Sequence, residues 1–183
     1  MHSFLKFLFL IIFSSSLAQN NEQKVDTIGV DILGASYTMY NNVLFKKGNY
    51  ETSFYENISL GKVYSVDIIN SQEVVLFYRD FNMVIVLDNR LNLIQSIRFQ
   101  NSLLFAKKGI ANTLWIFNLD KNKLELYNYK SKKTTFSSQI ITDFEPIEME
   151  SGFNFVKLIG KKKTLIFNQY LNLEETIIHQ KND

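Results

Sequence analysis

The stretch Leu87-Asp88-Asn89-Arg90-Leu91-Asn92-Leu93 returns eighty residues later, without a gap, as Phe167-Asn168-Gln169-Tyr170-Leu171-Asn172-Leu173. Halfway between these copies, Tyr127-Asn128-Tyr129-Lys130 again places an Asn and a polar turn after an apolar residue. The apolar segments before the three turns keep the same spacing, since they begin at residues 73, 113 and 153. The chain is therefore built on a repeat of about 40 residues.

A repeat of this length, made of short β-segments, is typical of β-propeller blades with four strands each. We therefore predict an all-β protein, a β-propeller of about four blades of four antiparallel strands each. The expected blades are residues 25–60, 61–100, 101–139 and 140–183. In the first blade only three strands are recognisable, at 35 to 40, 43 to 47 and 50 to 56. Four blades are the smallest number that closes a ring, so a closed ring and an incomplete, open ring remain alternatives.

Residues 1 to 18 have the features of a secretory signal peptide. A weakly positive start precedes an apolar run from 7 to 13, and Ser16-Leu17-Ala18 offers small residues to the peptidase. The run is much shorter than the roughly 20 residues that a membrane-spanning helix needs. We therefore expect cleavage between Ala18 and Gln19, no membrane span after cleavage, and an exported protein, either periplasmic or extracellular.

The composition excludes several kinds of chemistry. The chain has no cysteine, which removes disulfides, thiol nucleophiles and thiolate metal sites. The formal net charge is +2, and the basic clusters at 130–133 and 161–163 fall where hairpin turns are expected. We interpret both clusters as solvated loop tips, so no nucleic-acid partner is expected. No glycine-rich phosphate loop occurs either, and we expect no cofactor.

Catalytic residue types are sparse. After cleavage His179 is the single histidine and lies in a terminal strand, so a Ser-His-Asp triad and a zinc site are not expected. Glu145, Glu148 and Glu150 are able to serve as an acid–base pair or to hold a cation, although a solvated edge is the favoured interpretation. We assign no catalytic residue and no metal site.

The most informative loop is Tyr78-Arg79-Asp80-Phe81. A planar cation, a carboxylate and two aromatic rings at one face of a propeller suit the recognition of a sugar, a peptide or a protein. Tyr78, Arg79, Asp80 and Phe81 are therefore the candidate ligand-binding residues. The favoured interpretation of the loop is nevertheless structural, with Arg79 paired to Asp80 and Phe81 packed under the turn.

The second and third blades resemble a known family. The stretch 60–99 contains Leu76-Phe77-Tyr78-Arg79-Asp80-Phe81-Asn82 and Val86-Leu87-Asp88-Asn89, and it is similar to exported bacterial β-propeller proteins of NHL- or WD40-like architecture. Members of this largely uncharacterised family tend to be longer than this chain. The resemblance implies a propeller fold and offers no catalytic motif to carry over.

The favoured function is a non-catalytic, exported binding or scaffolding module for protein or glycan partners. The alternative is a carboxylate-dependent hydrolase or lyase that acts on envelope polysaccharide, which a raised carboxylate pKa in a central pocket would favour. In an open arc both faces of the last blade are expected to be uncovered, which favours a homo-oligomer through open blade faces, or poor solubility, over a compact monomer. The apolar residues expected on those faces are Phe153, Phe155, Val156, Leu165, Ile166, Phe167, Ile177 and Ile178.

Overall fold

The computed structural model describes residues 25–179, and these residues form four antiparallel sheets of four strands each. In every sheet the strands follow one another in sequence order, as in a meander. The prediction of an all-β chain with four-stranded blades is therefore confirmed. The expected signal peptide, with Ala18 and Gln19, lies outside the described residues. Within residues 25–179 no helix is long and apolar enough to cross a membrane.

The four sheets are called blades 1 to 4. Blade 1 contains β1 (Asp26–Val30), β2 (Ser36–Tyr40), β3 (Val43–Lys47) and β4 (Thr52–Tyr55). A short 3₁₀ turn, η1 (Ile58–Leu60), leads to blade 2, which contains β5 (Ser65–Asn70), β6 (Glu73–Tyr78), β7 (Met83–Asp88) and β8 (Leu93–Arg98). Blade 3 contains β9 (Leu103–Lys108), β10 (Thr113–Asn118), β11 (Lys123–Asn128) and β12 (Lys133–Ser137). Blade 4 contains β13 (Pro146–Ser151), β14 (Phe155–Gly160), β15 (Lys163–Asn168) and β16 (Leu173–Ile178).

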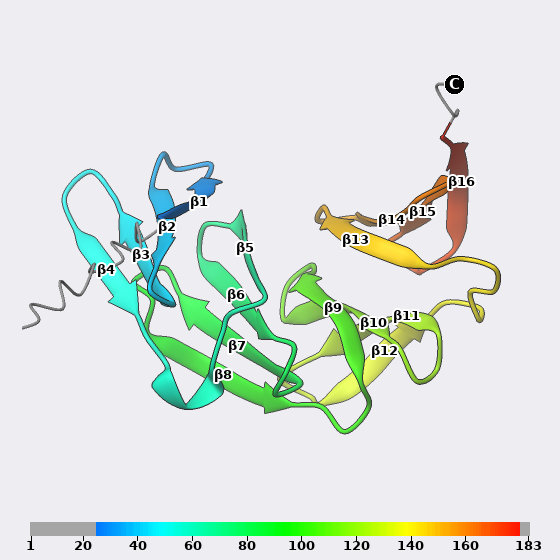
Figure 1. Ribbon diagram of the computed structural model, residues 1–183, viewed down its shortest axis with the longest axis horizontal. Coiled ribbons are helices and arrows are strands. Elements are labelled where there is room, and N and C mark those ends of the chain that lie inside the picture. The colour runs from blue at the N-terminus through cyan, green and yellow to red at the C-terminus, as the bar shows by residue number, and fades with distance from the viewer. Residues whose placement is uncertain (1–24, 180–183) are drawn as a thin grey trace, which may run out of the picture.

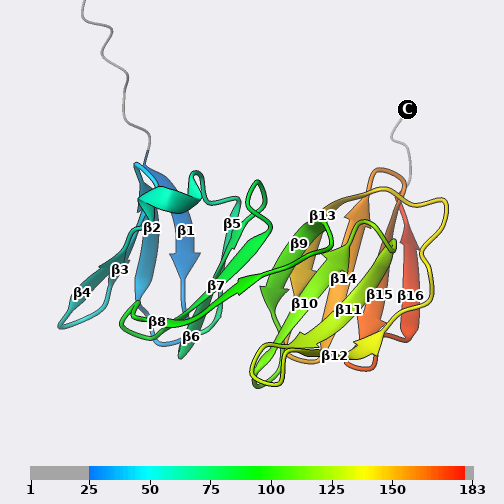
Figure 2. The ribbon, with the colours of Figure 1, turned by 90° about the horizontal axis from the view of Figure 1, so that it is seen from below.

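The blades stand side by side in an open arc (Figure 1). The first strand of each blade lies on the inner side of the arc, where β1 contacts β5, β5 contacts β9 and β9 contacts β13. Blades 1 and 4 are the two ends of the arc and lie apart in both views (Figure 2). The described residues therefore form an open ring, which decides between the two alternatives left by the sequence.

Apolar layers between neighbouring blades hold the arc together. Leu76 and Tyr78 point from β6 toward blade 1, whereas Val75 and Phe77 point from the same strand toward blade 3. The central strands of blade 2 are thus buried on both faces, as their continuous apolar sequence predicts. A third layer between blades 3 and 4 contains Trp115, the single tryptophan of the chain.

A side-chain amide joins each of the first three blades to the next one. Asn42, Asn82 and Asn122 lie forty residues apart, directly before the third strand of their blades, and have positive φ angles of 65°, 53° and 51°. Asn42 accepts a hydrogen bond from the Val63 amide at 2.7 Å and donates to the Gly61 carbonyl. Asn82 makes the equivalent contacts with the segment that leads into blade 3, and Asn122 donates to the Ile141 carbonyl.

Blade 4 departs from this pattern. The position of the linking Asn is Lys162, whose ammonium has no acceptor for a backbone amide. Leu44, Val84 and Leu124 are fully buried against the following blade, and the fourth member of this series is Thr164. The face of blade 4 that points away from blade 3, here called the forward face, also carries Lys157, Glu148 and Glu150. This face therefore mixes charges with apolar residues, unlike the layers inside the arc.

Three expectations from the sequence are corrected. Blade 1 has its fourth strand in β1, which was not located in the sequence because a bulge between Thr27 and Gly29 interrupts its alternation. The strand β14 begins at Phe155, two residues after its predicted start, because the β14–β15 turn has only two residues. Only one face of blade 4 is open, since Val156, Leu165 and Phe167 are buried against blade 3.

Candidate functional site

The candidate sites lie on one rim of the arc, here called the turn rim. It carries the turns between the second and third strands of each blade and the segments that lead into the first strands. Antiparallel order brings these two sets of residues to the same end of every sheet. In Figure 2 the turn rim is at the top, and the turns between third and fourth strands are at the bottom.

Tyr78 does not take part in a rim site. It is fully buried in the layer between blades 1 and 2, and its phenol group has no hydrogen-bond partner among the described residues. Burial, with a smaller contribution from Tyr55, raises the pKa of Tyr78 above its usual range. Tyr78 is therefore a core residue with an unsatisfied hydroxyl.

Arg79 connects blade 2 with blade 3. Its guanidinium lies 3.3 Å from the ring centroid of Tyr64 and donates a hydrogen bond of 3.0 Å to the Leu104 carbonyl. The Nε atom of Arg79 is buried without a partner, and Arg79 forms no ion pair with Asp80 within residues 25–179. Arg79 is therefore held by stacking and by a backbone acceptor rather than by the neighbouring carboxylate.

A small hollow of 260 Å³ is lined by Arg79 and Asp80 together with Lys62, Val63 and Tyr64. Phe81 is not among the lining residues and lies near Gly61, where an added Cβ would be 3.3 Å from the Phe81 ring. Of the four candidate residues, the structure thus brings two into one hollow. Sequence reasoning missed Lys62 and Tyr64, which belong to no motif, but the antiparallel order places the start of a first strand beside this turn.

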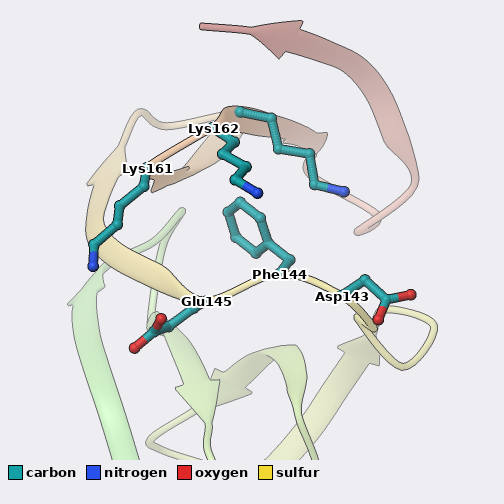
Figure 3. A pocket seen from close by; sticks show the side chains of 6 residues that line it. Asp143, Phe144, Glu145, Lys161 and Lys162 are labelled. Carbon is teal, nitrogen blue, oxygen red and sulfur yellow. The ribbon is translucent and has the colours of Figure 1, made fainter. Parts of the chain in front are cut away.

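A larger hollow of 580 Å³ occupies the equivalent place in blade 4. Its lining comes from the segment Asp143-Phe144-Glu145, which leads into β13, and from the turn residues Lys161, Lys162 and Lys163. Figure 3 shows the Lys162 side chain directed at the Phe144 ring, whereas Lys161 points away from it. The interpretation of 161–163 as a mere loop tip was incomplete, because these lysines border a hollow with an aromatic ring at its centre.

Phe144 is fixed from two sides. The Lys163 ammonium lies 5.7 Å from its ring centroid, a distance suited to a cation–π contact. On the other element, a Cβ added to Gly160 would come within 2.7 Å of the ring, so Phe144 packs directly on the β14 backbone. None of Lys161, Lys162 and Lys163 forms an ion pair with a carboxylate in residues 25–179. The three ammonium groups therefore remain available to a ligand.

Blades 2 and 4 repeat the same arrangement. Tyr64 and Phe144 are eighty residues apart, each lies shortly before a first strand, and each contacts a cation. The two blades differ in what the cationic side chain contacts. Arg79 is committed to the Leu104 carbonyl, whereas the lysines of blade 4 extend around an open hollow.

Several titratable groups of the interior join neighbouring blades. Lys108 is fully buried and pairs with Glu73 at 3.0 Å, and Tyr129 donates a hydrogen bond of 2.9 Å to the same carboxylate. Burial lowers the pKa of Lys108, and the attraction of Glu73 opposes this shift. Asp67 accepts hydrogen bonds from the Lys108 amide at 2.8 Å and from Ser151 at 3.0 Å, so one carboxylate links three inner strands.

The glutamates and the histidine identified in the sequence do not lie together in one site. Glu145 lines the blade 4 hollow, whereas Glu148 and Glu150 lie on the forward face, where Glu150 pairs with Lys157 at 3.5 Å. The ring nitrogens of His179 contact Thr164 Oγ1 at 2.9 Å and the Lys161 carbonyl at 3.4 Å. Within residues 25–179 no group of three or more His, Asp or Glu side chains is placed to hold a metal ion.

Two carboxyl groups next to turns, Asp88 and Asp120, have a pKa below the usual value. Hydrogen bonds from Ser102, with a smaller one from Asn101, lower the pKa of Asp120. At Asp88 burial acts upward, but hydrogen bonds from Asn92 and Arg90 outweigh it and lower the pKa. A general acid needs the opposite shift, because it must hold its proton near neutral pH.

Comparison with known proteins supports the fold and goes no further. No family model and no curated protein matches the sequence. A streptogramin B lyase structure matches 90% of this chain and 58% of its own length, with a TM-score of 0.64 and 16% identity. A catalytically inactive variant of virginiamycin B lyase from Staphylococcus aureus, with quinupristin, matches 89% and 58%, with a TM-score of 0.62 and 14% identity.

A third structure, BamB from Moraxella catarrhalis, matches 81% of this chain and 47% of its own, with a TM-score of 0.56 and 12% identity. The chain thus spans about half the length of the structures that it matches. These likenesses establish β-propeller architecture, whereas membership of the exported bacterial family suggested by the sequence is not confirmed. Since propellers carry many unrelated functions, function has to be argued from the site itself.

Proposed function

We propose that this chain is a non-catalytic binding module that holds a protein or glycan partner at its turn rim and acts outside the cytoplasm after loss of a signal peptide. The observation that carries the proposal is the blade 4 hollow. It combines an aromatic ring with three ammonium groups that have no carboxylate partner in the described chain. An aromatic surface with a few convergent polar groups is the usual composition of a ligand site.

The disposition of the other charged groups supports the same proposal. The buried Lys108 and Asp67 and the partly buried Glu73 are occupied in contacts between blades. Side chains used in this way hold an arc rigid, and a rigid scaffold positions rim residues well for binding. The alternative, a carboxylate-dependent hydrolase or lyase acting on envelope polysaccharide, needs an acid with a raised pKa beside a second carboxylate.

One experiment separates the two functions. The purified chain 19–183 is incubated with acidic and neutral polysaccharides and with acidic and basic peptides, and both binding and the chain length of each ligand are measured. We expect binding that weakens in Lys162→Gln and ligands that are recovered intact. Shortened or unsaturated polysaccharide products would overturn the non-catalytic assignment. The proposed export is checked by sequencing the N-terminus of the secreted protein, which should begin at Gln19.

A further inference from the structure

We propose that the blade 4 hollow binds a carboxylated sugar, namely a uronate unit of an acidic polysaccharide. This inference rests on the proposed binding function and names the ligand class of that same site. The hollow is lined by Asp143, Phe144, Glu145 and the three lysines 161–163. Its volume of 580 Å³ lies within the range of about 300–1,000 Å³ that is usual for small-molecule sites.

The lysines supply the attraction for a carboxylate. Five of the six lining residues are charged, three positively and two negatively. Lys161 and Lys162 are exposed, so their ammonium groups reach a ligand without a large desolvation cost. Lys162 stands where blades 1 to 3 have the Asn that ties the turn to the next blade. Its side chain is directed at Phe144 instead (Figure 3).

Phe144 supplies a surface for the body of a sugar. The C–H groups on one side of a pyranose form a flat, weakly positive surface, which fits the negative face of an aromatic ring. The ring is half-buried and rests against the Gly160 backbone, so its position is set before a ligand arrives. A ligand that consisted of charge alone, such as a phosphate ion, would leave this ring unused.

The two carboxylates favour a sugar over an acidic peptide. Asp143 and Glu145 flank Phe144 in the chain and line the same hollow as the lysines. Carboxylates accept hydrogen bonds from hydroxyl groups and repel a ligand that has only acidic groups. A uronate unit has several hydroxyl donors and a single carboxylate, so it satisfies the acids and the lysines together.

The blade 2 hollow is a natural comparison. It has an aromatic ring at the equivalent position, Tyr64, but a volume of only 260 Å³. Its cation, Arg79, lies on the Tyr64 ring at 3.3 Å and thereby covers one of its faces. The geometry therefore points to blade 4 as the sugar site and assigns the blade 2 cluster to the packing between blades.

The test is calorimetric titration of the chain 19–183 with an oligogalacturonate and with the same oligosaccharide after methyl esterification of its carboxyl groups. Esterification keeps the sugar and removes the charge, so we expect binding to weaken by at least about tenfold. Lys162→Gln and Phe144→Leu should each weaken binding of the free acid by about threefold to tenfold. Lys130→Gln, an exposed lysine of the β11–β12 turn on the opposite rim, is the matched charge control and should bind normally.

Polyglutamate and inorganic phosphate are titrated in parallel, and the thermal unfolding of each variant is recorded to show that it folds. Equal affinity for the free and esterified sugar, tighter binding of polyglutamate or phosphate, or no effect of either variant would overturn the inference. Binding of another partner that is lost in Lys162→Gln would leave the proposed function intact while rejecting the uronate. Cleavage of the oligogalacturonate would reject the non-catalytic function itself.

Discussion

Replacing Asn82 should loosen the joint between blades 2 and 3. Its amide donates to the Phe99 carbonyl at 2.8 Å and to the Asn101 carbonyl, and its oxygen accepts from the Leu103 amide at 2.9 Å. A hydrogen bond of this kind contributes about 0.5–1.5 kcal/mol to stability. Because Asn82 is only partly buried, water replaces some of the loss, and we expect Asn82→Gly to lower the free energy of unfolding by about 2 kcal/mol.

The backbone of Asn82 gives the second half of the prediction. Its φ of 53° lies in the left-handed region, which glycine adopts freely and alanine only at a cost of about 1–2 kcal/mol. Asn82→Ala should therefore destabilise the protein by about 3–4 kcal/mol, more than Asn82→Gly, although alanine is the stiffer residue in the unfolded chain.

Urea unfolding measures both variants. Circular dichroism reports on all four sheets, and the fluorescence of Trp115 reports on the layer between blades 3 and 4. Asn154→Ala is the control, since Asn154 is exposed and has no side-chain hydrogen bond in the described chain. A loss below about 0.5 kcal/mol for Asn82→Gly would contradict the linking role of this amide, and equal losses for glycine and alanine would contradict the backbone cost assigned to its positive φ.

Four further predictions rest on single contacts or single side chains. Tyr78→Phe should raise the free energy of unfolding by about 1 kcal/mol because it removes a buried hydroxyl without a partner, whereas Tyr129→Phe should lower it by a similar amount because that hydroxyl donates to Glu73. Burial also raises the pKa of both phenols, so the folded protein keeps these protons at a pH where the tyrosines of the unfolded chain ionise. The free energy of unfolding of the wild type should therefore fall as the pH rises above about 10, and it should fall less steeply in Tyr78→Phe. Gly160→Ala should displace Phe144, since the new Cβ would lie 2.7 Å from the ring and 3.0 Å from the Glu145 carbonyl oxygen. We expect a lower melting temperature and a drop of about threefold or more in uronate affinity; unchanged affinity would contradict the proposed role of the ring. Light scattering should detect a homo-oligomer that dissociates in Phe54→Lys, because Phe54 is 66% exposed and pairs with Phe45 on the uncovered face of blade 1; a wild-type monomer would contradict this.

The repeat made most of the fold predictable. The third strands of the four blades keep the forty-residue spacing, because each follows an Asn or Lys that ends a turn. The second strand of blade 4 does not keep it, since the β14–β15 turn is two residues shorter than the β6–β7 turn. The shorter turn therefore moved the start of β14 by two residues, while β15 kept the forty-residue spacing.

Burial of charged residues was harder to predict. The alternation Leu124-Glu125-Leu126 predicts that Glu125 lies on a polar face of its strand, yet Glu125 is buried. Lys121 at 2.9 Å and Asn118 at 3.3 Å satisfy its carboxylate inside blade 3. The alternation of apolar and polar residues does not reveal such compensation, because the partners come from the adjacent strand and turn.

Only part of the candidate site could be predicted from the sequence. Arg79 and Asp80 were found as a charged pair beside aromatics, but Tyr78 belongs to a strand that is buried on both faces. In blade 4 the lysine run was noticed without Phe144, which lies about seventeen residues earlier in the chain. Only the pairing of β13 with β14, which sets Pro146 opposite Gly160, brings the ring and the lysines together.

Binding without turnover at the turn rim of blade 4 can be observed directly in solution. A titration of isotope-labelled chain 19–183 with oligogalacturonate, followed by NMR, observes the protein amides and the sugar in the same tube. We predict shifts concentrated at residues 143–145 and 160–163, and sugar signals that remain those of the intact oligosaccharide. Shifts concentrated on the opposite rim, around Lys130 to Lys133, would contradict binding at the turn rim of blade 4, and shortened sugar products would contradict binding without turnover.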